Sequence, residues 1–459
     1  MATKRQELNM TEGPFLKKII CFTIPVMITG FLQTFYNAAD LAIVGRFRGE
    51  LALAAVGGNG SITTLIVGLF MGLSVGAGVM VAQQLGAGEK EQVKKTVHNA
   101  IMLAVLFGVI VGVIGWILAP YLLRLVSIPE TVINSAVLYL RIIFCGTPAS
   151  MIYNYCSAMV RSTGDTKHPL IFLTLSGVVN VFLNLVFVAV LGMSVDGVAL
   201  ATILSQYLSA GMILIYMMRS KSCIRFRFSE LRFDRKIVGR MMYIGLPSGL
   251  QSCAFALPNL MIHSSVNGFG EAAIAGNAAA SSLENFIGIL MNSFYHSSLT
   301  FVGHNVGAKK YRNIKRVILQ TMGCCFVVGV AGCLLLWFFR DFFLGLYMSD
   351  GNAEVKSYAV KRFLTMFPLY FFCGFQETLT GALRGLGKSV LALCATIFGA
   401  FVFRIFWLQV IFPIFPFYEC VIMTFPISYV IISAFCTICL ILVYRKQVKD
   451  DLLSLKSSK

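Results

Sequence analysis

Charge is what this sequence has little of. Asp, Glu, Lys and Arg make up only 13% of its 459 residues, against about 25% in soluble proteins. Hydrophobic residues make up 57%, and the mean hydropathy is +0.80. This balance excludes an ordinary soluble domain and predicts a polytopic membrane protein.

Catalytic and nucleotide-binding signatures are also scarce. Gly387-Lys-Ser389 resembles the end of a phosphate-binding loop, but Ala382 stands where that loop requires its first glycine. Most of the thirteen cysteines lie inside apolar runs, where they are expected to pack as small hydrophobic side chains. We therefore predict that the chain is not an enzyme, and that any transport draws its energy from an ion gradient.

Twelve apolar segments are long enough to cross a bilayer as helices. They cover residues 19–44, 54–82, 98–119, 132–159, 170–192, 197–218, 241–266, 273–302, 317–339, 357–380, 389–412 and 421–444. The first segment is too long for the apolar part of a signal peptide, so it is predicted to remain as a span. The predicted fold class is an all-α membrane protein with twelve transmembrane helices.

Basic residues gather in alternate connections between these segments. The first group includes Lys4 and Arg5, the longest and most basic connection is 219–240, and the last group begins at Arg445. By the positive-inside rule this side of the membrane, with both termini, is cytoplasmic. Topology and attraction to anionic lipids then account for the formal charge of +18, and no nucleic-acid binding is expected.

The chain contains two similar halves. Matching residues recur at offsets of 221 to 222: Pro25 and Pro247, Asn37 and Asn259, and VAQQLGA at 81–87 with VGHNVGA at 302–308. Six spans per half is an even number, so a pseudo-two-fold axis along the membrane normal is expected to relate the halves. We predict an N-lobe over 1–218, a basic cytoplasmic linker over 219–240, a C-lobe over 241–444 and a cytoplasmic tail over 445–459.

One carboxylate lies inside the first apolar segment. Gln33, Asn37 and Asp40 are spaced four and three residues apart, so a helix places them on one face. An acid in a membrane helix costs about 2.5–3.5 kcal/mol, which favours a functional role. Two alternatives stay open: Asp40 reaches water near the end of the span, or it is a structural partner in the bundle. Its counterpart in the second half is Ile262, so the fold itself does not require this acid.

Further polar residues lie in spans four to six of the first half. Asn180 and Asn184 share one helix face, and they either ligate a cation or bind a neighbouring helix. Asn154, Thr202 and Gln206 add polar groups in the same half. Together with the acid they predict a cavity whose oxygen donors suit Na⁺ or a proton rather than zinc or copper.

The second half carries two ionisable residues inside spans. Arg404 lies in span eleven, and an intramembrane Arg faces the bundle interior or water. It either contributes to substrate binding or coupling, or it is structural. His263 in span seven is more commonly a hydrogen-bonded core residue.

The chain resembles the MATE (multidrug and toxic compound extrusion) transporters, most closely their DinF branch, over essentially its whole length. The motifs that carry the resemblance are Pro25 with Gln33-x-x-Tyr-Asn-x-x-Asp40, the run at 81–87, and Arg161-Ser-Thr-Gly-Asp-Thr-Lys-His-Pro169. The resemblance implies cation-coupled efflux across a cell membrane, as in a prokaryotic inner membrane. It implies H⁺ or Na⁺ handling at Asp40, Asn180 and Thr202, with Asn184 beside them, and a lining of Tyr36, Asn37 and Asn154.

The chain departs from this family pattern in its acids. Many relatives carry a second acid in span five, where this chain has Asn184, and Phe255 replaces the C-lobe acid of the NorM branch. A single carboxylate holds one Na⁺ or one proton, so schemes that place two protons on two acids do not apply.

These observations predict a transporter that exports amphipathic, often cationic, organic compounds by alternating access, in exchange for H⁺ or Na⁺ and without a cofactor. The alternative is a flippase for lipid-linked sugars, which related folds of the superfamily perform and which a cationic central cavity would favour. The expected partners are small-molecule drugs or metabolites and the lipid bilayer. Each chain holds both lobes, so a monomer is expected.

Overall fold

The computed structural model describes residues 9–126, 128–346 and 353–457, with side chains as far as residue 447. Lys4, Arg5 and most side chains of the predicted tail lie outside these residues. Every regular element in the described residues is a helix, so the predicted all-α membrane fold is confirmed.

The helices follow the two halves of the chain. The first half contains α1 (Phe15–Gly58), α2 (Gly60–Gly86), α3 (Lys90–Leu125), α4 (Glu130–Cys145), α5 (Thr147–Ser162), α6 (Lys167–Asn184), η1 (Leu185–Val190) and α7 (Val195–Arg219). The connection and the second half contain η2 (Phe228–Glu230), α8 (Arg235–Asn267), α9 (Glu271–Gly307), α10 (Tyr311–Phe338), α11 (Arg340–Gly345), α12 (Ala353–Met366), η3 (Phe367–Leu369), α13 (Phe371–Gly385), α14 (Ser389–Thr396), η4 (Ile397–Val402), α15 (Phe403–Phe406), η5 (Trp407–Ile411) and α16 (Tyr418–Ser457).

Each of the twelve predicted spans coincides with a helix or with consecutive helices. By length and composition, seven helical stretches of the described residues qualify as membrane spans, or eight if the bent α4–α5 pair is one span. One of these stretches, Phe15–Gly86, joins α1 and α2. The other predicted spans correspond to α8, α9 and the α12–α13 pair, and α16 continues beyond its predicted span into the tail.

The chain divides into two compact units. Among the described residues, unit 1 holds Ile28–Gly249, and unit 2 holds Asn9–Met27 with the residues from Leu250 onward. These units differ from the predicted lobes at the beginnings of α1 and α8. The beginning of α1 belongs to unit 2, and the beginning of α8 belongs to unit 1.

The repeated motif at 81–87 and 302–308 provides a physical reason for this exchange. In unit 2, Asn305 Nδ2 donates a hydrogen bond to the carbonyl of Met10, just ahead of α1 (3.0 Å). In unit 1, Arg240 Nη2 near the start of α8 donates to Gln83 Oε1 (3.1 Å). Each copy of the motif therefore holds the beginning of the other half's first helix.

Glycines allow α2 to pack closely against α8 in unit 1. A Cβ atom on Gly72 would lie 2.3 Å from Gly249 Cα, and one on Gly76 would lie 2.1 Å from the carbonyl oxygen of Met241. Real Cβ atoms do not approach backbone so closely. Both positions therefore require glycine for this helix contact.

The predicted basic linker is packed against the start of α3. The Phe226 side chain is buried, and its ring lies 5.5 Å from the His98 ring. The backbone N–H groups of Arg227 and Asp234 donate to His98 Nε2 (3.1 Å) and Asn99 Oδ1 (2.7 Å). The linker thus keeps its basic side chains exposed while its backbone is fixed to unit 1.

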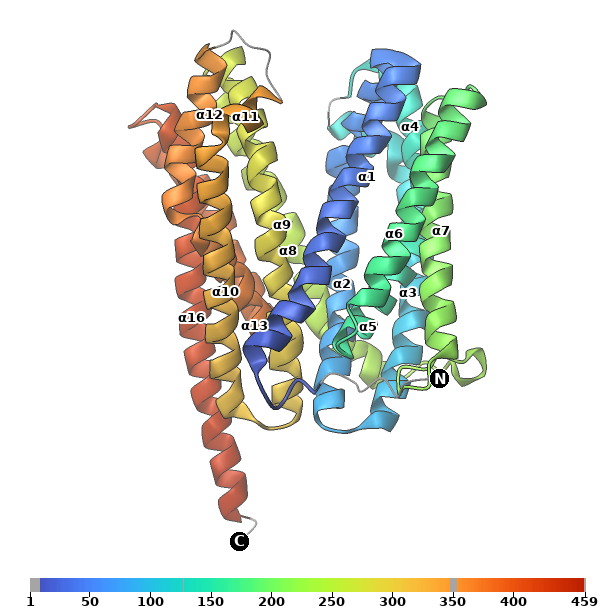
Figure 1. The fold of residues 1–459 in the computed structure, drawn as a ribbon, viewed down its shortest axis with the longest axis vertical. Helices are drawn as coiled ribbons and strands as arrows, with labels where there is room; N and C mark the ends of the chain where they lie inside the picture. The colour runs from blue at the N-terminus through green and yellow to red at the C-terminus, as the bar shows by residue number, and fades with distance from the viewer. Residues whose placement is uncertain (1–8, 127, 347–352, 458–459) are drawn as a thin grey trace. The chain divides into compact units, whose positions relative to one another are not determined.

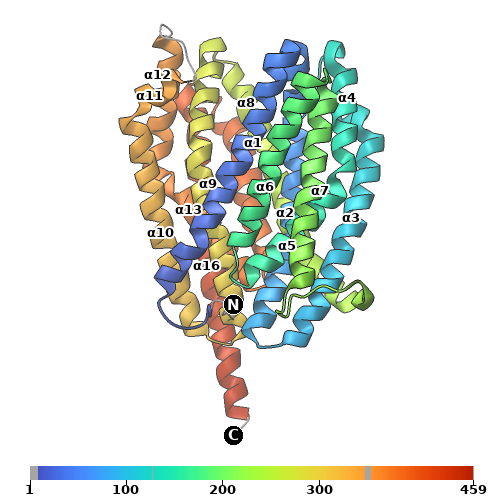
Figure 2. The ribbon, with the colours of Figure 1, turned by 45° about the vertical axis from the view of Figure 1, so that its right-hand side comes forward.

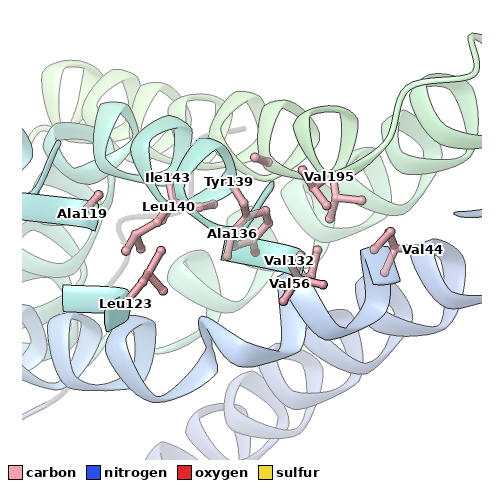
Figure 3. Close-up of a cluster of buried hydrophobic side chains, with 14 of the residues drawn as sticks. Val44, Val56, Ala119, Leu123, Val132, Ala136, Tyr139, Leu140, Ile143 and Val195 are labelled. Carbon is pink, nitrogen blue, oxygen red and sulfur yellow. The ribbon is translucent and has the colours of Figure 1, made fainter. Parts of the chain in front are cut away.

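An apolar core joins α1, α4 and α7 in unit 1, where α6 and α7 run side by side (Figures 1 and 2). Figure 3 shows part of this core, including Val44 of α1, Val132 and Ala136 of α4, and Val195 of α7, all of them buried. Val44 lies one helical turn beyond Asp40. The core therefore fixes the turn of α1 that carries the carboxylate.

The fifth and eleventh spans both contain π-helical turns. Span five changes from α6 to the π-helix η1 directly after Asn184, and span eleven has the π-helices η4 and η5 on either side of α15. π-Helical turns are rare in proteins, and those that do occur are often found at functional sites. Both spans carry polar residues that the sequence analysis selected.

Candidate functional site

Four predicted coupling residues meet in unit 1. Asp40 on α1 is only 9% exposed. Its Oδ1 accepts a hydrogen bond from Asn184 Nδ2 at the end of α6 (2.5 Å), and its Oδ2 accepts one from Thr202 Oγ1 on α7 (3.4 Å). Asn184 Nδ2 also approaches Asn180 Oδ1 at 3.3 Å. Residues from three helices are thereby brought to one carboxylate.

Within the described part of the chain, the Asp40 carboxylate has neutral hydrogen-bond partners. No basic side chain of the described residues forms an ion pair with it. In the same part of the chain, Asn184 Oδ1 is buried and accepts no hydrogen bond. A buried charge without a counter-charge is unfavourable, so the site is suited to a small cation that neutralises the acid.

Tyr36 lies beside this group because α6 has a glycine opposite it. The Tyr36 hydroxyl donates to the carbonyl of Thr174 (3.2 Å). A Cβ atom on Gly177 would lie 1.9 Å from an atom of the Tyr36 ring, so a larger residue would displace the ring. The predicted lining residue is therefore held between α1 and α6.

The other predicted lining residues do not hydrogen-bond to Asp40. Gln33 and Asn37 are exposed on α1, and Asn154 donates to a carbonyl of its own helix (2.8 Å). Gln206 Oε1 lies close to the bend between α4 and α5, 2.5 Å from where a Cβ of Gly146 would be. The structure thus separates four residues at the acid from a looser polar set.

Arg404 on α15 is a second buried charge, in unit 2. Its side chain is 1% exposed. Nη1 donates to Asn259 Oδ1 on α8 (2.8 Å), and Nε and Nη2 donate to Ser428 Oγ on α16 (3.0 and 2.8 Å). His263, in contrast, is exposed on α8, so the interpretation as a core residue is wrong.

Three further charged residues of unit 2 were not predicted as site residues from the sequence. Arg362 Nη2 lies 2.7 Å from Glu284 Oε2, both side chains are buried, and Nη1 donates to Asn277 Oδ1 (2.6 Å). Glu377 on α13 accepts a hydrogen bond from Asn292 Nδ2 (3.0 Å). All three residues lie inside predicted spans, where charged side chains are rare. That position is the signal by which the sequence could have identified them. Their pairing depends on contacts between distant helices.

Two short patterns in the chain match catalytic or redox motifs but lack the required setting. Gly72-Leu-Ser-Val-Gly76 has the G-x-S-x-G spacing, yet Ser74 lies within α2 and donates to the Met71 carbonyl (2.7 Å) rather than standing on a strand-to-helix turn. Cys436-Thr-Ile-Cys439 has C-x-x-C spacing but lies inside the membrane part of α16. No group of three metal-binding side chains occurs in the described residues.

Comparison with known families identifies the duplicated unit. The MatE family model matches twice, at residues 25–186 and 247–408, and so repeats the offset of 222 found in the sequence. The chain belongs to the MatE family. It is therefore a multi-pass membrane transporter and not an enzyme. The assignment to the DinF branch stays a prediction.

Relatives of this MatE protein match most of its length. It is 26% identical over 397 residues to the probable multidrug resistance protein YpnP of Bacillus subtilis, covering 86% of this chain and 88% of the relative. It is 22% identical to an FAD transporter of Shewanella oneidensis, covering 84% and 86%. A crystal structure of MATE in complex with MaL6 superposes with a TM-score of 0.90 at 21% identity, covering 97% of this chain and 99% of the other, which establishes the shared fold.

Proposed function

We propose that this MatE protein is a cation-coupled antiporter that exports amphipathic organic compounds, many of them cationic, by alternating access. The coupling ion is H⁺ or Na⁺, and it binds at Asp40. The observation that carries the proposal is the Asp40 carboxylate, which is buried among neutral donors from α6 and α7. The multidrug names of several relatives support the substrate class.

A single carboxylate sets the stoichiometry of the proposed site. In unit 1, the neighbours of Asp40 are the amides Asn180 and Asn184 and the hydroxyl of Thr202. None of them takes up a proton near neutral pH. The site therefore holds one monovalent cation in each transport cycle.

The two candidate ions place different demands on Asn184. A proton on Asp40 requires only that the carboxyl group donate a hydrogen bond. Na⁺ requires oxygen ligands, whereas Asn184 directs its Nδ2 at Asp40 and leaves its buried Oδ1 without a hydrogen bond. Rotation of this amide would supply an oxygen ligand beside Asp40 and Thr202.

Antiport then follows from linkage. If the coupling ion binds the outward-facing and inward-facing states with different affinity, it shifts their populations, and the substrate does the same. Export results when ion binding at Asp40 favours release of the substrate on the outside. By the positive-inside rule the termini are on the cytoplasmic side in this scheme. The protein acts as a monomer, because one chain holds both repeats.

The test is ethidium efflux from proteoliposomes with an imposed proton or Na⁺ gradient. Asp40→Asn keeps the shape of the side chain but removes the charge, and we expect gradient-driven efflux to fall to background. Glu50→Gln, which changes an exposed acid on the same helix, is the control and should transport normally. Wild-type efflux by Asp40→Asn, or efflux that survives collapse of both gradients, would contradict the proposal.

A further inference from the structure

Arg404 is a buried cation without an acidic partner among the described residues. Its three side-chain nitrogens donate to Ser428 Oγ and Asn259 Oδ1, both neutral. Among the described residues no carboxylate forms an ion pair with it. In the same unit, the buried Arg362 is neutralised by Glu284, and the buried Arg384 interacts electrostatically with Glu377. Burial alone therefore does not explain why Arg404 lacks an acid.

A structural bridge between helices would not require a charge at this position. A glutamine amide in span eleven could donate to the same hydroxyl and carbonyl oxygens of α16 and α8. It would avoid the desolvation cost of a buried guanidinium without a counter-ion. The unneutralised charge indicates that an anion completes the site during the transport cycle.

Aromatic rings surround the guanidinium. Arg404 Cζ lies 4.8 Å from the ring centroid of Phe425, 5.6 Å from that of Phe255 and 5.6 Å from that of Tyr429. These three rings are half-buried, as is Asn259, so they reach from the guanidinium to the surface of unit 2. Aromatic side chains stack on planar ring systems, and Arg binds planar anions through paired N–H groups.

The depth of Arg404 favours a solute over a lipid headgroup. It stands seven residues before the end of the span at Ile411, which corresponds to about 10 Å along a helix. Lipid phosphates lie at the membrane surface, outside the hydrocarbon core. The π-helices η4 and η5 on either side of α15 give this part of the span an irregular backbone, which membrane transporters commonly use where they bind substrate.

We propose that Arg404, with Asn259 and the rings of Phe255, Phe425 and Tyr429, binds a carboxylate or phosphate group on an aromatic solute. This inference rests on the proposed export function, since it names part of the substrate of that transporter. The substrates then include amphipathic molecules with an anionic group. The anion neutralises Arg404 and the aromatic body stacks on the rings.

The test compares two dyes with the same xanthene ring, anionic fluorescein and cationic rhodamine 123. Binding to purified full-length protein is measured by fluorescence polarisation, which requires no ion gradient. We expect wild type to bind fluorescein and Arg404→Gln to bind it about tenfold more weakly or worse, while rhodamine 123 affinity changes by less than about twofold. Arg404→Lys should retain part of the fluorescein affinity. Equal fluorescein affinity in wild type and Arg404→Gln would overturn the proposal.

A second variant keeps the test decisive if Arg404→Gln does not fold. Asn259→Asp preserves side-chain shape and places a carboxylate at the acceptor that lies 2.8 Å from Arg404 Nη1. This internal counter-ion should preserve or raise thermal stability and lower fluorescein affinity about tenfold. Unchanged fluorescein affinity in folded Asn259→Asp would contradict the anion site.

Two additional measurements separate this inference from its alternatives. Displacement of fluorescein by short-chain phosphatidylglycerol would assign the site to a lipid and overturn the solute proposal, whereas we expect no displacement. Failure of the antiport proposal would be seen as efflux that is independent of the ion gradients, with dye binding still sensitive to Arg404. Failure of the anion site would be seen as insensitive dye binding with gradient-driven efflux intact.

Discussion

Corresponding groups of three helices in the two repeats each hold one buried ionic side chain, and the two side chains have opposite charges. In unit 1, spans one, five and six contribute Asp40, Asn184 and Thr202. In unit 2, the equivalent spans seven, eleven and twelve contribute Asn259, Arg404 and Ser428. Each group joins one ionic side chain to an amide and a hydroxyl, yet the ion is a carboxylate on the first helix in one repeat and a guanidinium on the fifth in the other.

We interpret this difference as two sites of opposite charge on one duplicated scaffold. Each repeat supplies three helices that meet inside the membrane and place an amide and a hydroxyl next to the ionic side chain. In the roles proposed above, the group around Asp40 binds a cation and the group around Arg404 binds an anion. A second contrast lies within unit 2, where Arg362 forms an ion pair with Glu284 and Arg404 forms none with the residues that the structure describes. We interpret the first arginine as structural and the second as part of a binding site.

The largest effect on stability is expected when the ion pair between Arg362 and Glu284 is removed. Glu284→Gln leaves Arg362 buried without its counter-charge, which should lower the free energy of unfolding by about 3–5 kcal/mol. Thermal unfolding of purified protein, followed by size-exclusion chromatography, would measure the shift. Glu354→Gln, at an exposed acid of α12, is the control and should change stability little. A Glu284→Gln protein as stable as wild type would remove the contrast between the two arginines.

The next largest effect is expected from alanine substitutions at two equivalent glycines, one in each repeat. Gly177 and Gly399 are 222 residues apart. A Cβ added at Gly177 would lie 1.9 Å from the Tyr36 ring, and one added at Gly399 would lie 2.4 Å from Ile432 Cγ1. Changing either to Ala should cost about 1–3 kcal/mol through overpacking. Only Gly177→Ala should also weaken cation coupling, because Tyr36 lies beside the Asp40 group. The coupling-ion concentration at half-maximal efflux measures the strength of cation coupling. Gly211→Ala is the control, because a Cβ added at Gly211 would have no atom within 4 Å.

A smaller effect is expected from the hydroxyl at Asp40. Thr202→Val removes the 3.4 Å hydrogen bond to Asp40 Oδ2 but keeps the side-chain shape. A hydrogen bond of this kind contributes about 0.5–1.5 kcal/mol, so the coupling-ion concentration at half-maximal efflux should shift roughly two- to tenfold. Ser209→Ala, which removes a hydroxyl bonded to its own helix (2.8 Å), should leave that concentration unchanged. If the two variants behave alike, Thr202 has no part in ion binding.

The smallest expected effect on stability concerns the unpaired arginine. Arg404→Met replaces an unneutralised buried charge with an apolar chain of similar length. The free energy of unfolding should stay within about 1 kcal/mol of wild type or increase, in contrast with Glu284→Gln. Thermal unfolding measures both variants under the same conditions. A loss comparable to that of Glu284→Gln would assign Arg404 a structural role.

Much of the fold followed from the sequence because membrane helices have a strong apolar signal. The twelve spans, the duplication and the family resemblance all depend on patterns along the chain, and the family model repeats the offset that Pro25 and Pro247 indicated. The exchange of the beginnings of α1 and α8 was not predicted. It depends on contacts between distant residues, such as Asn305 with Met10.

The candidate site was only partly predictable. Spacing placed Asn180 and Asn184 on one face, but the orientation of the Asn184 amide toward Asp40 is set by how α6 packs on α1. The same limit explains why Gln206 was grouped with the acid although its oxygen lies by Gly146. The sequence also contains the charges Glu284 and Arg362 without any pattern that pairs them, because their helices are far apart in the chain.

The most direct test of the account measures ion coupling and dye preference in the same proteoliposomes. Wild type, Asp40→Asn, Arg404→Gln and the double variant would be compared for gradient dependence of efflux and for the ratio of fluorescein to rhodamine 123 binding. We expect Asp40→Asn to abolish gradient dependence and keep the dye ratio, and Arg404→Gln to change the dye ratio and keep gradient dependence. Two results would contradict separate sites of opposite charge. In one, a single substitution changes both the gradient dependence and the dye ratio; in the other, a substitution changes neither of them.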